Sequence, residues 1–275
     1  MSNLQLRIIS AIVLGAAVLL ITWLGGLPFR ILAALISGAM FYEWAVMSRG
    51  ALANRVSGSL AMLPEILILV FMVALVGGVS ANLLIGFIVL AAIALIICAK
   101  AGMTTRWDAG GFVYASLSGL AIAMLRDGDA SGLVAILFLF AIVWTTDILA
   151  YFVGRAIGGP KLAPAISPGK TWSGAIGGTI GGILGGFLIA AFVGTGATFF
   201  LIIVAAFLSV ISQLGDLFES WVKRRHGVKD SGHLIPGHGG VMDRADGLVA
   251  AAFAMYLIGW ALGSADHPSH VFFSI

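Results

Sequence analysis

The sequence predicts an all-α, polytopic integral membrane protein with about nine transmembrane helices. Two observations support this fold class. Of its 275 residues, 60% are hydrophobic and only 10% are charged, whereas soluble domains carry roughly 25% charged residues. The apolar residues also form long runs without charge, of the length that a bilayer requires.

Each of the nine apolar runs is close to a full span, because a bilayer core of about 30 Å needs roughly 20 apolar residues per helix. Two neighbouring pairs are separated only by turn residues, at Gly77-Gly78 and at Gly194-Thr195-Gly196. The runs are residues 8–26, 29–48, 57–77, 80–99, 109–125, 131–153, 173–193, 197–218 and 247–264.

The distribution of Lys and Arg predicts the orientation of these spans. With the N-terminus inside, 13 of the 15 basic residues lie on the cytoplasmic side, and only Arg30 and Arg126 lie outside. This orientation places the polar segment 219–246 in the cytoplasm. It also accounts for most of the net charge of +3, so we expect no nucleic-acid partner.

Glycines recur through the predicted span 173–193. Gly174, Gly178, Gly182 and Gly186 form one i, i+4 row, with a second glycine row beside it. Small residues at this spacing allow helix backbones to approach closely in lipid. We expect them to pack against other helices of the same chain; the alternative is a subunit interface, as in a homodimer.

Three carboxylates lie within apolar runs: Glu43, Glu65 and Asp147. An ionised group at mid-membrane is costly and usually faces a cavity or a partner. Asp147 lies about two turns before the cytoplasmic end of its span, and we expect it to contribute to function. Its alternative role is a hydrogen bond to a neighbouring helix, while the roles of Glu43 and Glu65 stay open.

The predicted cytoplasmic loop that ends at Trp172 contains Lys170 with hydroxyl groups at Ser167 and Thr171. The Gly-Lys-Thr triplet is not a P-loop, because Pro164 stands where that motif needs glycine. We expect Lys170 and these hydroxyls to bind phosphate. The alternative is an ordinary basic loop on the cytoplasmic side.

Acidic residues flank the segment 219–246, which holds nine of the 27 charged residues. Asp216 ends the eighth predicted span, with Ser220 one turn later, and Asp243 and Asp246 open the ninth. Such carboxylates suit a hard cation such as Mg²⁺. With lysines, arginines and a glycine-rich turn between them, the pattern favours metal-assisted phosphoryl or nucleotidyl transfer. A solvated charged loop with acids that cap helices is the alternative.

The amino-acid sequence of this segment resembles the sequence motif of the phosphatidate cytidylyltransferase (CDP-diacylglycerol synthase) family. The match spans residues 220–246, and the stretches FYEW, LAPAISPGKTW and SQLGDLFES are similar to the family as well. The positions that carry it are Ser220, Lys223-Arg224, Lys229-Asp230, Gly232, Ile235-Pro236, His238-Gly239-Gly240, Asp243-Arg244 and Asp246.

The resemblance implies transfer of CMP from CTP to phosphatidic acid, giving CDP-diacylglycerol and pyrophosphate, at the inner (cytoplasmic) membrane. It implies a metal pair, Mg²⁺ with a second ion, held by Asp216 and Asp246 with Asp243 alongside. It also implies one transmembrane domain over residues 1–275, with N-terminal helices in 1–130 and catalytic helices in 131–265 that carry cytoplasmic loops 154–172 and 219–246. Phosphate or substrate contacts are expected from Lys223, Arg224, Lys229, Arg244, His238, Gly239 and Gly240.

Three other functions are weighed against this one. A transferase acting on another lipid phosphate, such as an isoprenoid phosphate, would have the same charged residues. A secondary transporter would be expected to show two matching halves, and the sequence has no such internal repeat. A membrane-anchored interaction protein would not need this spacing of acids and glycines.

Overall fold

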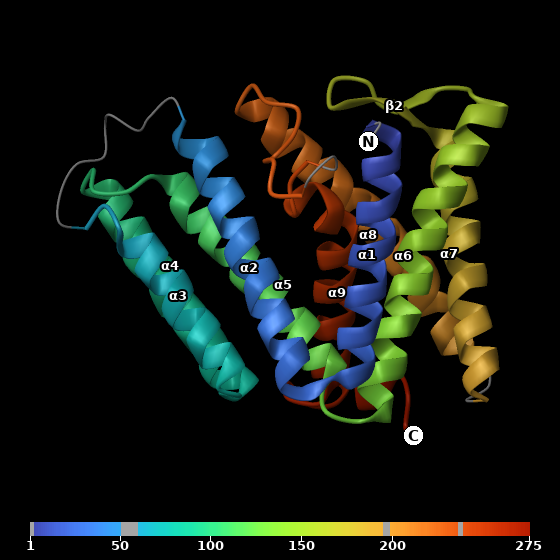
Figure 1. Ribbon diagram of the computed structural model, residues 1–275, viewed down its shortest axis with the longest axis horizontal. Helices are drawn as coiled ribbons and strands as arrows, with labels where there is room; N and C mark the ends of the chain where they lie inside the picture. Colours follow the sequence, from blue (N-terminus) through green and yellow to red (C-terminus); the bar gives the residue numbers. More distant parts are fainter. Residues whose placement is uncertain (1–2, 51–59, 195–198, 236–238) are drawn as a thin grey trace. The chain divides into compact units, whose positions relative to one another are not determined.

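The protein is an array of helices, seen in a computed structural model that describes residues 3–50, 60–194, 199–235 and 239–275, with side chains from residue 10 onward. Figure 1 shows the elements along the chain. The described residues form α1 (Asn3–Leu24), α2 (Gly26–Arg49), α3 (Leu63–Val76), α4 (Ala81–Lys100), α5 (Arg106–Arg126), α6 (Ala130–Ile157), β1 (Lys161–Ala163), β2 (Ser167–Thr171), α7 (Trp172–Val193), α8 (Phe199–Arg225), α9 (Met242–Leu262) and a 3₁₀ helix, η1 (Pro268–Val271).

The helical membrane fold is confirmed. Within the described residues every predicted span has a corresponding α-helix, and seven helices are long and apolar enough to cross a membrane. The two others are shorter in their described apolar part, and α3 has only 14 residues. Nine is therefore an approximate count of spans.

Three helices continue well beyond their predicted apolar runs. Helix α6 extends to Ile157, α8 extends to Arg225, and α9 begins at Met242. The apolar-run criterion ends a span where polar and charged residues become frequent, but backbone hydrogen bonding does not stop there. Parts of the expected loops 154–172 and 219–246 are therefore helical, namely residues 154–157, 219–225 and 242–246.

The chain divides into two compact units. The first comprises Met1–Met124 and Asp230–Arg244, and the second comprises Leu125–Lys229 and Ala245–Ile275. In the second unit, α6 and α7 lie side by side along their length (Figure 1).

The glycine rows of α7 pack against helices of the same unit. A Cβ atom added at Gly178 would lie 2.9 Å from the carbonyl oxygen of Thr146 on α6. At Gly182 it would lie 2.5 Å from the hydroxyl of Thr146 and 2.7 Å from the Cβ of Ser209 on α8. Thr146 and Ser209 are hydrogen-bonded at 2.7 Å. Close intramolecular packing therefore accounts for these glycines, as the sequence predicts.

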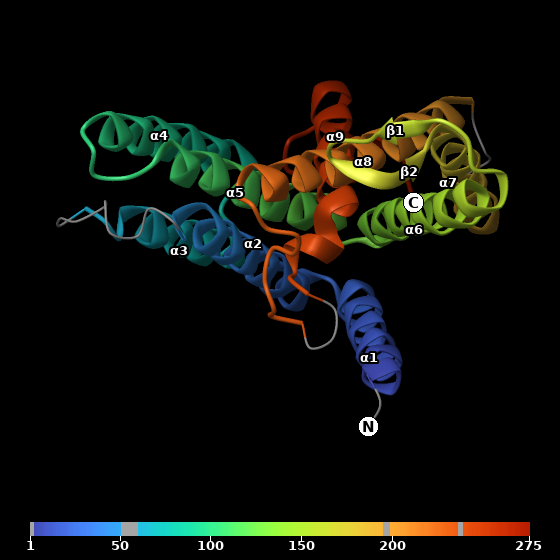
Figure 2. The same ribbon diagram turned by 90° about the horizontal axis from the view of Figure 1, so that it is seen from above.

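A β-hairpin follows α6 where the sequence predicts only an irregular loop. Strands β1 and β2 pair antiparallel, with Lys161 opposite Thr171. The side chain of Thr171 caps α7 by accepting a hydrogen bond from the backbone N–H of Gly174 (3.1 Å). Figure 2 shows the hairpin at the end of α6 and α7. These contacts hold Lys170, the residue before the cap, in a defined position.

The first unit contains a buried ion network between three helices. Asp108 on α5 is 1% exposed and accepts a hydrogen bond from the guanidinium Nε of Arg49 at the end of α2 (2.6 Å). Arg49 also pairs with Glu65 in the first turn of α3. Thr105 and Asp108 exchange backbone-to-side-chain hydrogen bonds in a capping box at the start of α5. Glu65 therefore serves to anchor helix ends.

Candidate active site

A pocket of about 680 Å³ opens in the second unit between α6, the hairpin, α7 and α8. This volume is in the range of small-molecule sites. Three predicted residues with charged side chains line it: Asp147, Lys170 and Asp216. Thr171 lines it as well. The structure therefore brings together residues that the sequence separates by up to 69 positions (216 − 147).

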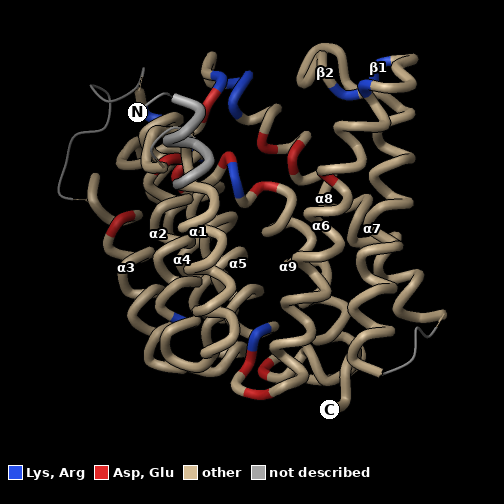
Figure 3. Tube along the Cα trace, turned by 45° about the vertical axis from the view of Figure 1, so that its right-hand side comes forward, with Lys and Arg blue, Asp and Glu red and all other residues tan. Residues whose placement is uncertain are grey.

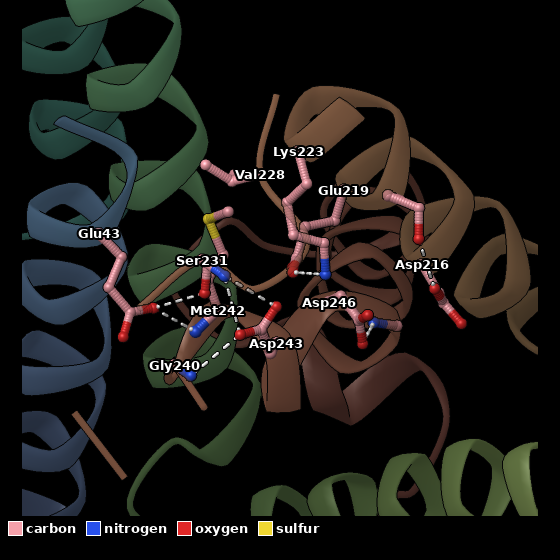
Figure 4. A network of polar contacts seen from close by, with 12 residues as sticks. Glu43, Asp216, Glu219, Lys223, Val228, Ser231, Gly240, Met242, Asp243 and Asp246 are labelled. Atoms are coloured by element: carbon pink, nitrogen blue, oxygen red, sulfur yellow. Dashed lines mark hydrogen bonds and ion pairs between the residues drawn. The ribbon is translucent and has the colours of Figure 1, made fainter. Parts of the chain in front are cut away.

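An ion pair joins the hairpin to α8 at this pocket. The ammonium group of Lys170 pairs with one carboxyl oxygen of Asp216, and the hydroxyl of Ser220 donates to the other oxygen (3.3 Å). Both partners of the ion pair are partly exposed, at 27% and 33% of their side chains. Figure 4 shows Asp216 together with Asp246, Glu219 and Lys223. An anionic ligand that enters the pocket would compete with Asp216 for Lys170.

Helix α9 brings a third acid to this region of the second unit. A Cβ added at Gly215 would lie 2.8 Å from the carbonyl oxygen of Asp246, so the backbones of α8 and α9 touch beside Asp216. Asp246 interacts electrostatically with Asp216 and Asp147, and Asp147 in turn with Lys170. Grouped carboxylates repel one another, which favours a cation among them. All are oxygen donors, and Mg²⁺ usually takes one or two carboxylates together with substrate phosphates, so this donor set fits Mg²⁺.

The basic end of α8 is held by further ion pairs and hydrogen bonds. Lys223 pairs with the fully buried Glu219 one turn earlier (3.0 Å). Arg224 donates to the backbone oxygens of Ile166 in the hairpin turn (3.4 Å) and of Val228 (3.2 Å), so it connects α8 to the hairpin. Burial, followed by the charge of Arg225, lowers the pKa of His226. This shift favours the neutral form of the His226 imidazole. Lys229 is exposed beyond this end of the helix.

Glu43 is the centre of a buried network in the first unit (Figure 4). Its side chain is 1% exposed. One carboxyl oxygen accepts from the backbone N–H of Val241 (2.8 Å), and the other accepts from the N–H of Met242 (2.8 Å) and the hydroxyl of Ser231 (3.1 Å). These backbone groups lie at the N-terminus of α9, which has no intrahelical partners for its first N–H groups and favours negative charge.

Asp243, which belongs to the same segment, stabilises it through hydrogen bonds to its backbone. Its carboxylate accepts from the backbone N–H groups of Ser231 (2.9 Å) and Gly240 (2.9 Å). A Cβ at Gly240 would lie 2.5 Å from the Glu43 carboxylate, and Gly239 has φ +86°, so both positions favour glycine. In the first unit Asp243 and Glu43 thus shape the loop that precedes α9.

The remaining predicted residues have the following places. Ser167 is in β2, half-buried, and does not line the pocket. Arg244 is exposed on the first turn of α9. His238 lies outside the described residues.

Comparison with known proteins identifies the family. A model of the cytidylyltransferase family matches residues 5–262. The chain belongs to the cytidylyltransferase family. It is 49% identical over 274 residues to a phosphatidate cytidylyltransferase of Brucella suis biovar 1 (strain 1330), covering 100% of both chains. The proteins of that name from Rickettsia bellii (strain RML369-C) and Bacillus subtilis (strain 168) are 33% and 31% identical over 270 residues. These matches cover 94% of this chain, and 91% and 98% of theirs.

As a member of this family, the chain is a nucleotidyltransferase that uses CTP, which agrees with the prediction from its charged segment. Sequence reasoning did not select four residues that line the pocket: Tyr151, Arg155, Lys161 and Gln213. Tyr151 and Arg155 could have been found from their i, i+4 spacing, which places both side chains on one face of α6. In the structure the guanidinium of Arg155 donates a hydrogen bond to the Tyr151 hydroxyl (2.9 Å). Lys161 could not be selected from the sequence, because only the hairpin places it near Lys170.

Proposed function

We propose that this membrane protein transfers the CMP group of CTP to the phosphate of phosphatidic acid, forming CDP-diacylglycerol and pyrophosphate. The observation that carries the proposal is the pocket in which the Lys170–Asp216 ion pair lies with Asp147 and two further cations, Arg155 and Lys161. The printed names of the relatives agree with it.

In the proposed reaction a phosphate oxygen of phosphatidic acid attacks the α-phosphorus of CTP. The bond from that phosphorus to the oxygen bridging the α- and β-phosphates breaks, and pyrophosphate leaves. A phosphate monoester is largely dianionic at pH 7, so no general base is required. The work of the protein is to position two anions and to neutralise charge as it shifts to the leaving group.

We assign this work to the charged groups around the pocket. Lys170, Lys161 and Arg155 would bind phosphate oxygens, and Lys170 would release Asp216 when it does so. Asp216 and Asp246, with Asp147 beside them, would hold Mg²⁺. Bound Mg²⁺ would supply charge neutralisation on the phosphate oxygens. A second ion would be coordinated mainly by substrate, and Asp243 would help to place the segment that carries Asp246.

The proposed setting is the inner membrane, with the pocket facing the cytoplasm, where CTP is available. The 13-to-2 distribution of Lys and Arg supports it. A reporter enzyme fused after residue 275 should then behave as external, and a cytoplasmic reporter signal at that position would contradict the orientation.

The direct test uses the purified chain in lipid nanodiscs with radiolabelled CTP and phosphatidic acid. We expect labelled CDP-diacylglycerol only when Mg²⁺ is present, and loss of turnover in Asp246→Asn. The matched control is Asp266→Asn, which removes an acid that neither lines the pocket nor, unlike Asp246, interacts with Asp147, and which should keep turnover. Absence of product in the wild-type chain would refute the proposal, and labelled product from a polyprenyl phosphate alone would move the function to another lipid phosphate.

A further inference from the structure

A second group of potential ligands lies in the second unit, at the turn before α6 and in the C-terminal segment. Within the described part of the chain, Asp127, His267 and His270 are the three residues whose ligand atoms all lie within 4.8 Å of one another. Figure 3 shows charged residues near the C-terminus, at the opposite end of α6 from the hairpin. None of these three residues lines the catalytic pocket.

We propose that Asp127, His267 and His270 bind a Zn²⁺ ion, with Asp129 as the fourth ligand. The Nδ1 atom of His267 is 2.5 Å from Oδ2 of Asp127. The Nε2 atom of His270 is 2.5 Å from Oδ2 of Asp129 and 3.8 Å from Oδ2 of Asp127. Asp127 and the two imidazoles thus come together from segments about 140 residues apart, and Asp129 reaches the group through His270.

The spacing of these atoms is close to that of a tetrahedral zinc site. Zn–N and Zn–O bonds of about 2.0–2.2 Å place neighbouring ligand atoms roughly 3.4 Å apart. The two separations from Asp127 Oδ2 to the histidine nitrogens, 2.5 and 3.8 Å, lie on either side of this value, so binding of the ion requires the side chains to rotate. His267 and His270 are 55% and 48% exposed, which leaves a path for its entry.

The backbone holds the ligands in place without using all of their donor atoms. Asp129 caps α6 by accepting from the N–H of Gly132 through Oδ1 (2.9 Å), which leaves Oδ2 for the ion. Asp127 has φ +43°, and among the described residues it is the one non-glycine residue with a positive φ. Such a conformation costs energy and often accompanies a functional constraint. His270 lies in η1, and Phe273, two residues after the end of η1, packs edge-to-face on Phe138 of α6.

The donor set selects the class of metal. Imidazole nitrogen with carboxylate oxygen in a four-ligand arrangement suits Zn²⁺. Mg²⁺ and Ca²⁺ prefer six or more oxygen ligands. Without metal, the same residues form two His–Asp hydrogen bonds at an exposed surface, which contribute little to stability.

The test is a metal titration of the full chain in nanodiscs, purified without a polyhistidine tag and stripped with EDTA. Excess Mg²⁺ occupies the carboxylates of the catalytic pocket before Zn²⁺ is added. We expect one Zn²⁺ per chain, and a dissociation constant more than about 100-fold weaker in the His267→Ala/His270→Ala variant, since each ligand contributes strongly to affinity. The control is His233→Ala, which removes an exposed histidine of the first unit and should bind as the wild type does.

Two further measurements separate a metal site from a misfolded variant. Asp127→Asn keeps a residue that tolerates positive φ but removes the negative charge, so it should weaken Zn²⁺ binding while its helical circular dichroism and elution stay unchanged. Co²⁺ bound in place of Zn²⁺ should show the intense visible absorption of a tetrahedral site, absent in the double variant. Equal Zn²⁺ binding in the wild type and the double variant, or no bound Zn²⁺ in the wild type, would overturn the proposal.

Discussion

Replacing Glu43 should loosen the N-terminus of α9. The carboxylate of Glu43 accepts three hydrogen bonds, two of them from the backbone N–H groups of Val241 and Met242. Hydrogen bonds to a charged acceptor contribute about 1.5–3 kcal/mol each, and a buried donor left without a partner costs roughly 1–3 kcal/mol. Because these contributions overlap, we expect Glu43→Ala to cost about 4 kcal/mol of local stability.

Glu43→Gln gives a graded comparison. The amide oxygen can replace the carboxyl oxygen that accepts two hydrogen bonds, but the amide NH₂ then faces the N–H of Val241. One bond is lost and the others are weaker, so the expected cost is about 2 kcal/mol. A factor of ten in an opening equilibrium corresponds to about 1.36 kcal/mol. Amide exchange at Val241 and Met242 should therefore accelerate about 30-fold in Glu43→Gln and roughly 10³-fold in Glu43→Ala.

The assay is hydrogen–deuterium exchange with mass spectrometry on the protein in nanodiscs, read on peptides that contain Val241 and Met242. The control is Glu65→Gln, which changes a 38% exposed acid of the same unit that pairs with Arg49 and not with α9. Its exchange at these two amides should match the wild type. Unchanged protection of both amides in Glu43→Ala would refute the assignment of Glu43 as the cap of α9.

Three further predictions concern the second unit. Lys170→Ala should raise the KM for CTP about 10- to 100-fold, as expected for a lost charge-assisted hydrogen bond. Lys170→Arg should restore part of the lost affinity. An unchanged KM for CTP in Lys170→Ala would show that Lys170 does not bind CTP and is only one of the basic residues that set the membrane orientation. Gly182→Val should lower the free energy of unfolding by about 2–3 kcal/mol through overpacking, measured by thermal unfolding, whereas Gly86→Val, where an added Cβ meets nothing within 4 Å, should not. Lys223→Met should destabilise the chain by removing the ammonium group that pairs with the buried carboxylate of Glu219, and adding Glu219→Gln should restore the unfolding temperature. Recovery of turnover as well would argue against a phosphate contact for Lys223.

Helix existence followed from the sequence because the apolar runs are long and the cost of exposed backbone in lipid leaves few alternatives. Helix ends were harder to predict, since the predicted apolar run stops at residue 218 whereas α8 continues to Arg225. The hairpin was missed because its strands are only three and five residues long and their pairing carries no apolar alternation.

In the candidate site, too, the residues could be predicted from the sequence but their contacts could not. Asp216, Asp246, Lys170 and Asp147 were selected from residue type and position. The sequence did not reveal that Lys170 pairs with Asp216, because that contact depends on the hairpin folding back toward α8. Nor did it assign Glu43, since a lone acid in an apolar run can face a cavity, a partner or a helix end with equal ease.

By itself, the sequence determined a polytopic helical membrane protein and the family to which it belongs, and it predicted a charged segment suited to nucleotidyl transfer. These properties depend on composition and on the order of residues, which are local. Only the tertiary structure decided the roles of individual side chains. It placed Glu43 at the start of α9, closed the Lys170–Asp216 pair at the pocket, and grouped Asp127 with His267 and His270. Each of these contacts joins segments between 46 and 199 residues apart, and no local pattern specifies which distant residue will fill the space beside a given side chain.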